Sequence, residues 1–158
     1  AVAMLRHQSA VLVSPDAMAA GIRAAHWPAR LQRLRPGPLT ALAPGRTVWL
    51  DGGHNRDAGE AIARHFTGQR LHLILGMLAN KDPASLTSPL GDAIASLQSV
   101  SIPGHESHAL DAFGPAARPA ASVAEALSRL PADGLPVLIG GSLYLAGEVL
   151  RLNGELPD

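Results

Sequence analysis

The sequence predicts an α/β fold, a doubly wound and mostly parallel sheet with helices on both faces. Four short apolar segments typical of buried strands alternate with segments of helical periodicity. Aromatic residues make up 3% of the 158 residues and apolar residues 47%, so the core must be mainly aliphatic. Such a core suits helices packed on a parallel sheet. Because no internal repeat and no second core are evident, we expect one domain over residues 1–158.

Composition excludes several classes of function. The formal net charge is zero, so there is no electrostatic footprint for a nucleic acid. Cysteine is absent, which excludes disulfides, thiolate metal sites and cysteine nucleophiles and fits a reducing, cytoplasmic compartment. No apolar run reaches the roughly 20 residues that a membrane span requires. We therefore expect neither a nucleic-acid partner nor a membrane partner.

The chain begins AVAMLRHQSAV, without an initiator methionine. We therefore expect residues 1–13 to be the remnant of an upstream segment of a longer protein. Ser14 and Pro15 predict the N-cap and first residue of a helix, which should end near His26 because a Trp-Pro pair follows. One face of this helix carries Met18, Ile22 and Ala25.

An arginine-rich segment comes next. Residues 27–34, WPARLQRL, place Arg30 in an extended or turning chain. Its guanidinium is the best phosphate or carboxylate fork in the sequence; the alternative is an arginine that is simply exposed to solvent. We expect residues 35–38, RPGP, to form a turn and residues 39–42 to form an edge strand.

The most informative stretch is WLDGGHN, residues 49–55. Residues 47–50 predict a buried strand, which leads into Asp51, two glycines, His54 and Asn55. Strand, glycine turn and helix is the arrangement in which α/β proteins place ligands, because the glycines admit a ligand and the helix N-terminus attracts an anion. The alternative is that Asp51 and Asn55 only cap the helix. The apolar face of that helix is expected to comprise Ala58, Ala61, Ile62, His65 and Phe66.

A second buried strand is expected at residues 71–75, LHLIL, and it is followed by Lys81 and Asp82. Asp82 should cap a helix that begins at Pro83 and restarts at a Ser-Pro pair. The apolar face of this helix would continue through Leu90, Ile94 and Leu97.

The third strand is expected at residues 99–102, before a loop that contains His105 and His108. Residues 112–121 are rich in alanine and proline, and the pattern assigns them no element. A fourth buried strand is expected at residues 136–139.

Two helices complete the pattern. Ser122 and Glu125 form a capping box at the start of the first helix. Gly-Gly-Ser142 opens the last helix, which should run to about Leu152. The same tripeptide could form an anion nest, although Ser142 is also an ordinary N-cap residue. The apolar face of the first of these helices comprises Val123, Ala126, Leu127 and Leu130.

Polar residues follow every predicted strand. Because the carboxyl ends of parallel strands share one edge, these side chains can converge although they are far apart in sequence. Each residue also has a simpler interpretation. The lysine and the histidines could be exposed to solvent without a function, and the aspartates and the serine could only cap helices. The residues in question are Asp51, His54, Lys81, Asp82, His105 and Ser142.

Several motifs are missing from the sequence. It contains no G-x-x-x-x-G-K-[ST] phosphate loop and no G-x-G-x-x-G dinucleotide fingerprint. It also contains no H-E-x-x-H and no G-x-S-x-G. The chain therefore carries half of a site, namely an arginine, a carboxylate and a helix N-terminus, without the groups that usually hold a triphosphate and magnesium.

The order of five strings resembles a known family. WPARLQRL, WLDGGHN, LILGMLANKD, IPGH and VLIGGSLYLAGEVL together are similar to the C-terminal domain of dihydrofolate synthase/folylpolyglutamate synthase, a branch of the Mur ligase superfamily. The similarity covers residues 14–152 in the family's order. DG-x-HN, KD and GSLY, each after a strand, are its most specific part.

The resemblance implies an ATP-dependent, ADP-forming ligase. In this family ATP phosphorylates a pteroate or folyl carboxylate, and the amine of L-glutamate attacks the acyl phosphate. The implied partners are ATP, L-glutamate, dihydropteroate or folate, and the chain's own N-terminal ATPase domain. That domain would supply the Mg²⁺ ligands, so we expect no metal ligand in this chain and no activity from this chain alone.

The resemblance also implies roles for individual residues. Arg30 matches an arginine that contacts the ATP phosphates, and Asp51 matches an aspartate that binds the nucleotide. His54 matches a histidine near nucleotide or glutamate, so Arg30 and His54 are the catalytic candidates. Ser142 matches a serine linked to glutamate binding.

The remaining matches are weaker. Lys81 and Asp82 match the family's KD pair, and the resemblance places them at the cleft edge, in contact with substrate or in a structural role. The sequence departs from the family strings by Ala29 in place of Gly, Gly53 in place of Ala and Arg56 in place of Pro. The loop after His108 also looks shortened.

Two other hypotheses stay open on the sequence. One is a non-catalytic Rossmann-like module that binds a nucleotide or an amino acid. The other is a metal hydrolase that uses Asp51, His54 and His105, although no ligand spacing supports it.

Overall fold

A six-stranded sheet forms the centre of the computed structural model, which describes residues 2–7, 10–25 and 27–156. The strand order is β1-β2-β6-β3-β4-β5. β1 runs antiparallel to β2, and the other neighbouring strands are parallel. The predicted doubly wound, mostly parallel sheet is therefore confirmed. The strands are Gln32–Arg33 (β1), Val48–Asp51 (β2), Leu71–Leu75 (β3), Ile94–Ser99 (β4), Ala117–Pro119 (β5) and Val137–Gly140 (β6).

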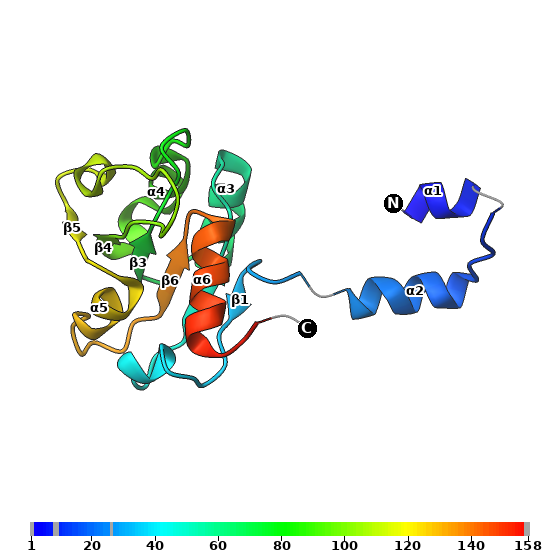
Figure 1. The fold of residues 1–158 in the computed structure, drawn as a ribbon, viewed down its shortest axis with the longest axis horizontal. Helices are drawn as coiled ribbons and strands as arrows, with labels where there is room; N and C mark the ends of the chain where they lie inside the picture. The colour runs from blue at the N-terminus through cyan, green and yellow to red at the C-terminus, as the bar shows by residue number, and fades with distance from the viewer. Residues whose placement is uncertain (1, 8–9, 26, 157–158) are drawn as a thin grey trace.

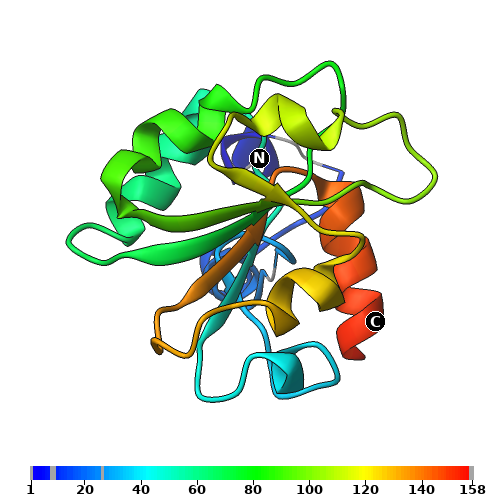
Figure 2. The same ribbon diagram turned by 90° about the vertical axis from the view of Figure 1, so that its left-hand side faces the viewer.

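Helices cover both faces of the sheet (Figure 2). α3 and α4 pack on one face through one hydrophobic cluster, and α5 and α6 pack on the other face through a second cluster. The helices are Val2–His7 (α1), Pro15–Ala24 (α2), Arg56–His65 (α3), Ala84–Leu90 (α4), Val123–Ser128 (α5) and Leu143–Asn153 (α6), with 3-10 turns Thr40–Leu42 (η1), Gly91–Ala93 (η2) and Leu110–Phe113 (η3).

β3 shows why the central strands are apolar throughout. Leu71, Leu73 and Leu75 belong to the cluster under α3 and α4, whereas Ile74 belongs to the cluster under α5 and α6. Side chains alternate between the two faces of a strand. With both faces covered, every position is buried, which produces the run LHLIL.

Two element predictions are wrong around the third strand. The helix α4 includes Pro89 without a restart and ends at Leu90, and Gly91 follows with a φ of 45°. Ile94 and Leu97, expected on a helix face, therefore lie in β4. The strand starts five residues earlier than expected because the left-handed glycine stops the helix.

The edges of the sheet also differ from expectation. Residues 39–42, expected as an edge strand, contain the 3-10 turn η1, and the edge strand is instead β1 at Gln32–Arg33. β5, at the opposite edge, lies in the alanine- and proline-rich segment that received no assignment. Both edge strands are two or three residues long, and such short elements leave little periodic signal.

The helix caps are largely as predicted, except that α4 begins at Ala84 with Pro83, and not Asp82, at its N-cap. The hydroxyl of Ser14 accepts from the amide of Ala17, and that of Ser122 accepts from the amide of Glu125. In α3, however, the buried face is formed by Gly59, Ile62 and Phe66, whereas Ala61 and His65 are exposed. The prediction that Ala61 and His65 belong to the packed face of this helix is therefore wrong.

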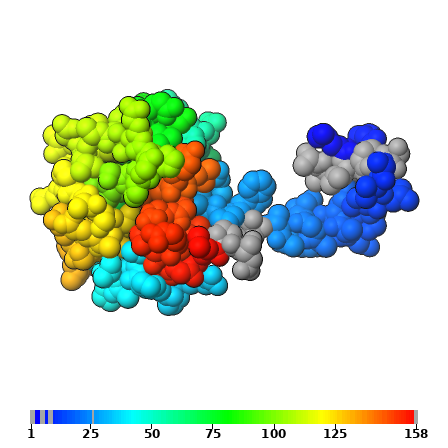
Figure 3. Space-filling model, viewed as in Figure 1, coloured from blue at the N-terminus to red at the C-terminus, as the bar shows by residue number. Residues whose placement is uncertain are grey.

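α1 and α2 project away from the sheet and its helices (Figures 1 and 3). α2 has no buried residue, and its Ile22 is 58% exposed. The helix ends at Ala24; His26, where the end was expected, lies outside the described residues. The apolar face of α2 is thus uncovered in this structure. Across the described part of the chain, no helix has the length and apolar character that a bilayer span needs.

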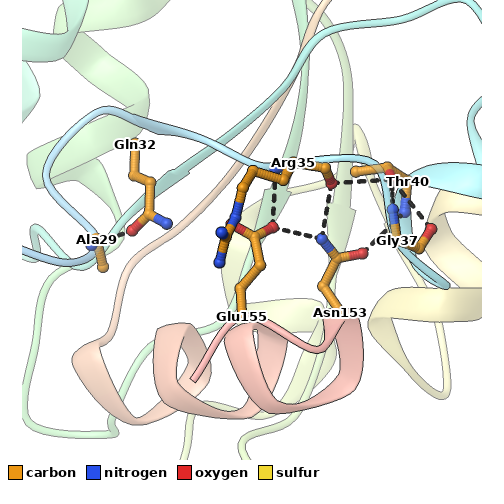
Figure 4. Close-up of polar contacts among 7 residues, drawn as sticks. All are labelled: Ala29, Gln32, Arg35, Gly37, Thr40, Asn153 and Glu155. Carbon is orange, nitrogen blue, oxygen red and sulfur yellow. Dashed lines mark hydrogen bonds and ion pairs between the residues drawn. The ribbon is translucent and has the colours of Figure 1, made fainter. Parts of the chain in front are cut away.

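The end of α6 anchors the loop that leads from β1 to η1 (Figure 4). The side-chain oxygen of Asn153 accepts from the amide of Leu39 at 3.0 Å, and its nitrogen donates to the carbonyl of Arg35 at 3.0 Å. The carboxylate of Glu155 accepts from the amide of Arg35 at 2.8 Å. Gly37 lies so close that a Cβ there would be 2.4 Å from the Asn153 carbonyl. This network fixes the segment that follows Arg30.

Replacing Asn153 with alanine is expected to lower the free energy of unfolding by about 2 kcal/mol or more, because buried partners lose their hydrogen bonds. Asn153 is 3% exposed, whereas Asn80 is exposed and serves as a matched control. Urea unfolding measures both variants. An equal effect of Asn153→Ala and Asn80→Ala would contradict this account of the loop anchor.

Candidate functional site

The carboxyl ends of β2 and β6 lie side by side. Asp51, the last residue of β2, pairs in register with Gly140, the last residue of β6. Ser142 follows two residues later and caps α6. The glycine turn after β2 and the Gly-Gly-Ser turn after β6 therefore lie at the same edge of the sheet, as the sequence predicts.

Asp51 holds two segments together. Its Oδ2 accepts from the amide of Leu31 at 2.7 Å, and its Oδ1 accepts from the amide of Gly53 at 2.7 Å. The residue is 6% exposed. The cap of α3 is Asn55, whose Oδ1 accepts from the amide of Ala58 at 2.9 Å. The prediction that Asn55 caps α3 is therefore confirmed, whereas the alternative that Asp51 also caps this helix is wrong. Asp51 instead joins the segment after Arg30 to the glycine turn by hydrogen bonds.

Arg30 lies between two residues with left-handed backbone. Ala29 has a φ of 56° and Leu31 a φ of 42°. The amide of Ala29 donates to the side chain of Gln32 at 2.9 Å (Figure 4), and the amide of Gly52 donates to the carbonyl of Ala29 at 2.9 Å. A positive φ is unfavourable for a residue other than glycine. These hydrogen bonds hold the backbone of Ala29 in that conformation despite its cost in free energy. The exposed guanidinium of Arg30 is thereby presented from a fixed backbone.

The φ of 56° at Ala29 is one that glycine adopts without strain and that an L side chain rarely adopts. We expect Ala29→Gly to raise the free energy of unfolding by about 0.5–1 kcal/mol, since relief of strain exceeds the extra chain entropy of glycine. Ala61→Gly, within α3, should instead lower it by about 0.5–1 kcal/mol. Denaturant titration of the two variants checks the sign, and destabilisation by Ala29→Gly would contradict the strained backbone.

A cavity of about 490 Å³ lies between the segment that contains Arg30 and the start of α3, and we call it the Arg30 cavity. It is lined by Arg30, Asp51, His54 and residues of the first turns of α3. The ring Nδ1–H of His54 donates to the carbonyl of Gly52 at 3.3 Å, because that oxygen can only accept. A guanidinium, an imidazole and a helix N-terminus thus surround one space, a combination that suits an anionic group.

The start of α6 packs beside this cavity and does not line it. A Cβ at Gly52 would lie 2.3 Å from the side chain of Leu143 and 3.3 Å from Nη1 of Arg30, so only glycine fits between them. Ser142 is 3% exposed, and its hydroxyl accepts from the amide of Tyr144 at 3.1 Å. Ser142 therefore acts as the N-cap of α6.

The loop after β4 also reaches the start of α6. The rings of His105 and Tyr144 stack with centroids 3.8 Å apart and planes at 28°. His105 thus joins the Ser142 turn and not the Asp51 turn. The described residues contain no group of three His, Asp or Glu side chains that could hold a metal, so the metal-hydrolase hypothesis with His105 has no geometric support.

Lys81 and Asp82 lie apart from the Arg30 cavity. Asp82 accepts from the amide of Ala84 at 2.9 Å, at the start of α4, and it lines a separate cavity of about 370 Å³ with Arg56. The carbonyl of Lys81 contacts the ring of His108. Neither Lys81 nor Asp82 is among the residues that line the Arg30 cavity, and Asp82 borders the neighbouring cavity at the start of α4.

Sequence reasoning missed the partners that hold Arg30 in place. Leu31 contributes only its main-chain amide, which has no signature in a sequence. Gln32 caps the turn with a side chain, but glutamine is not among the residues that mark turns. The contacts of Gly52 with Arg30 and Leu143 depend on the packing of three separate segments.

Comparison with known proteins places this geometry in context. No family model matches the chain. The chain is 29% identical over 153 residues to a folylpolyglutamate synthase of Lacticaseibacillus casei, covering 87% of this chain and 32% of that protein. It is 31% identical over 149 residues to a probable bifunctional folylpolyglutamate synthase/dihydropteroate synthase of Haloferax volcanii, covering 86% of this chain and 17% of that protein.

A solved structure shows the same fold. The folylpolyglutamate synthase of Mycobacterium tuberculosis, complexed with ADP and AMPPCP, superposes with a TM-score of 0.71 and 25% identity, over 92% of this chain and 36% of that one. The chain thus spans about a third or less of the proteins it matches. The curated and structural neighbours are thus folylpolyglutamate synthases, and this chain is similar to a fragment of each that corresponds to their C-terminal domain.

Proposed function

We propose that this chain supplies one half of the active site of an ATP-dependent, ADP-forming ligase that adds L-glutamate to dihydropteroate or to folates. The observation that supports the proposal is the Arg30 cavity, which Asp51 also lines. There the guanidinium of Arg30, the ring of His54 and the N-terminus of α3 surround one space, in a chain related to folylpolyglutamate synthases. An anion-binding space of this kind suits a phosphoryl group in transfer.

The residue roles follow from what each group can do. Arg30 would neutralise charge that develops when a phosphoryl group passes from ATP to the substrate carboxylate. His54, whose Nδ1 is engaged by the Gly52 carbonyl, keeps Nε2 for a nucleotide or glutamate oxygen. Asp51, with both carboxylate oxygens bonded to amides, would act by positioning Arg30. The glutamate amine then attacks the acyl phosphate, and the amide forms as phosphate leaves.

Other residues would contribute less directly. Ser142 caps α6 and would keep that helix N-terminus aimed at the edge where glutamate carboxylates bind. Lys81 and Asp82 would act at the rim of the site, where Asp82 holds the start of α4 through the amide of Ala84. Mg²⁺ would neutralise phosphate charge in such a ligase, but the described residues hold no metal-ligand cluster. By analogy with the related synthases, we propose that a further domain of a longer cytoplasmic protein supplies its ligands and the ATPase half-site.

An assay of two proteins tests the proposal. The 158-residue chain, mixed with ATP, glutamate and dihydropteroate, should release no phosphate above background. The whole gene product should release phosphate and ADP only when glutamate and a pterin acceptor are both present, and parallel assays with dihydropteroate and tetrahydrofolate define the acceptor. Turnover by the 158-residue chain would refute the half-site. Nucleotide binding by the whole product without amide formation would favour a non-catalytic binding module.

A further inference from the structure

A second polar cluster lies at the amino ends of the strands, opposite the Arg30 cavity. His72, the second residue of β3, is 1% exposed. Its Nδ1 lies 2.7 Å from the hydroxyl of Ser96 in β4, and its Nε2 lies 3.1 Å from both oxygens of Asp133, in the loop before β6. Serine, imidazole and carboxylate are thus joined in one continuous chain of hydrogen bonds, which nothing in the ligase proposal uses.

The direction of these hydrogen bonds can be assigned. The hydrogen bond from His72 holds the pKa of Asp133 at about 2, below the ordinary value of 3.8. Arg46 also donates to Asp133 at 2.9 Å. Asp133 is therefore an ionised carboxylate that only accepts, so Nε2 of His72 carries the proton. In the neutral ring, Nδ1 is then a free base, and the hydroxyl of Ser96 donates to it.

Ser96 also faces an open space. It lines a cavity of about 600 Å³ together with Gln98, Arg118 and Arg129. The guanidinium of Arg129 bonds to Glu125 and to the carbonyl of Pro119. Arg118 is exposed on the edge strand β5. A serine hydroxyl that is bonded to a base thus borders a cavity with two guanidinium groups, which favour an anionic ligand.

We propose that Ser96, His72 and Asp133 form a second, hydrolytic site that takes small esters carrying a carboxylate or a phosphate. A serine, a histidine base and a carboxylate that orients the base are recognised by geometry and roles, whatever their order in the chain. The order here, histidine, serine and aspartate, is therefore no obstacle. Arg118, which is exposed at the rim of the cavity, would bind the anionic group and stabilise the developing oxyanion.

The reaction balances with water as the only co-reactant. Oγ of Ser96 bonds to the ester carbonyl carbon while its proton passes to Nδ1 of His72. The carbon–oxygen bond to the leaving alcohol breaks, and that alcohol takes the proton from His72. Water then attacks the acyl group on Ser96, one of its protons passes through His72 back to the Ser96 oxygen, and the acid is released. Asp133 stays ionised and stabilises the imidazolium.

A neighbouring serine shows what a purely structural hydroxyl looks like in the same strand. Ser99, also in β4, is fully buried, and its hydroxyl donates to the carbonyl of Leu110 at 2.7 Å. That bond satisfies the hydroxyl without a base. Ser96 differs in both respects, because its partner is an imidazole and it borders a cavity.

Ester hydrolysis and covalent labelling test the site in the 158-residue chain, without any ligase substrate, so that failure here leaves the ligase proposal unaffected. We expect diisopropyl fluorophosphate to modify Ser96, as peptide mass spectrometry would show, and Ser96→Ala to abolish the adduct. After subtraction of the rate without protein, mono-4-nitrophenyl succinate should be hydrolysed faster than 4-nitrophenyl acetate, and Arg118→Gln should remove that preference. Asp133→Asn should slow hydrolysis by about 10²-fold. An unmodified Ser96 and hydrolysis no faster than that of Ser96→Ala would overturn the proposal.

Alkylation of an introduced thiol tests the contact between residue 96 and His72 without any ester substrate. The chain contains no cysteine, so Ser96→Cys introduces a unique thiol. We expect iodoacetamide to alkylate it at pH 6 about tenfold faster than the thiol of Ser101→Cys, because a neighbouring imidazolium lowers the pKa of a thiol. Ser101 is exposed just beyond β4 and provides the matched control. Circular dichroism confirms that both variants fold, and equal alkylation rates would show that His72 serves only to join β3 to β4.

Discussion

Replacing Arg30 with alanine is expected to reduce turnover of the proposed full-length ligase by about 10²-fold or more, the range for loss of one group that stabilises transition-state charge. The guanidinium lines the cavity beside Asp51 and is exposed, with a side-chain bond only to the carbonyl of Ala29 among the described contacts. Stability should therefore change little. Steady-state kinetics with saturating ATP, glutamate and acceptor measures the effect on kcat.

Arg33 provides the control for charge alone. It is exposed in β1, three residues from Arg30, and lines a different cavity near η1. Arg33→Ala should leave kcat within about twofold, since a remote surface charge contributes little. Arg30→Lys should recover only part of the activity, because an ammonium lacks the planar fork of a guanidinium. If the kcat of Arg30→Ala equals that of the wild type, Arg30 has only a structural role.

Replacing Asp51 with alanine should affect both folding and catalysis. The amides of Leu31 and Gly53 would each lose a charged acceptor at 2.7 Å. Because such groups cost about 1–3 kcal/mol each when left unpaired, we expect a loss of about 2–4 kcal/mol in the free energy of unfolding. Turnover should fall by about 10²-fold as well, since misplacement of a charge-stabilising group is costly.

Asp57 provides the control that distinguishes loss of the Asp51 hydrogen bonds from loss of a negative charge. It lines the same cavity and is exposed in the first turn of α3. Asp57→Ala should change stability by no more than about 0.5 kcal/mol. Urea unfolding and kinetics on the same preparations show whether the two losses in Asp51→Ala occur together. A variant with full stability but no turnover would make Asp51 a direct ligand of the nucleotide instead.

The departures from the family strings acquire a physical meaning in the structure. Ala29 occupies a left-handed position, where glycine would be relaxed. Gly53 stands where the family string has alanine, and a Cβ there would lie 2.5 Å from the Cβ of Ala58 and 2.8 Å from Oδ1 of Asp51. The turn after β2 is thus closed more tightly here than an alanine would permit.

The ligase proposal and the hydrolytic proposal concern opposite ends of the same sheet. The Arg30 cavity lies at the carboxyl end of β2, where α/β proteins usually bind ligands. His72 lies at the amino end of β3, in a strand that the apolar pattern marks only as buried. No motif drew attention to it, because Ser96 and Asp133 are 24 and 61 residues away along the chain.

The sequence by itself determined the fold class, the strands β2, β3 and β6, most caps and the glycine turn that carries Asp51 and His54. These features arise from local causes: apolar runs, capping side chains and glycines act within a few residues. Only the tertiary structure decided the two edge strands and the direction of the loop with Lys81 and Asp82. It alone brought the amide of Leu31 to Asp51, and Ser96 and Asp133 to His72. Such contacts join segments that no local pattern relates, since strand order and packing decide which of them meet.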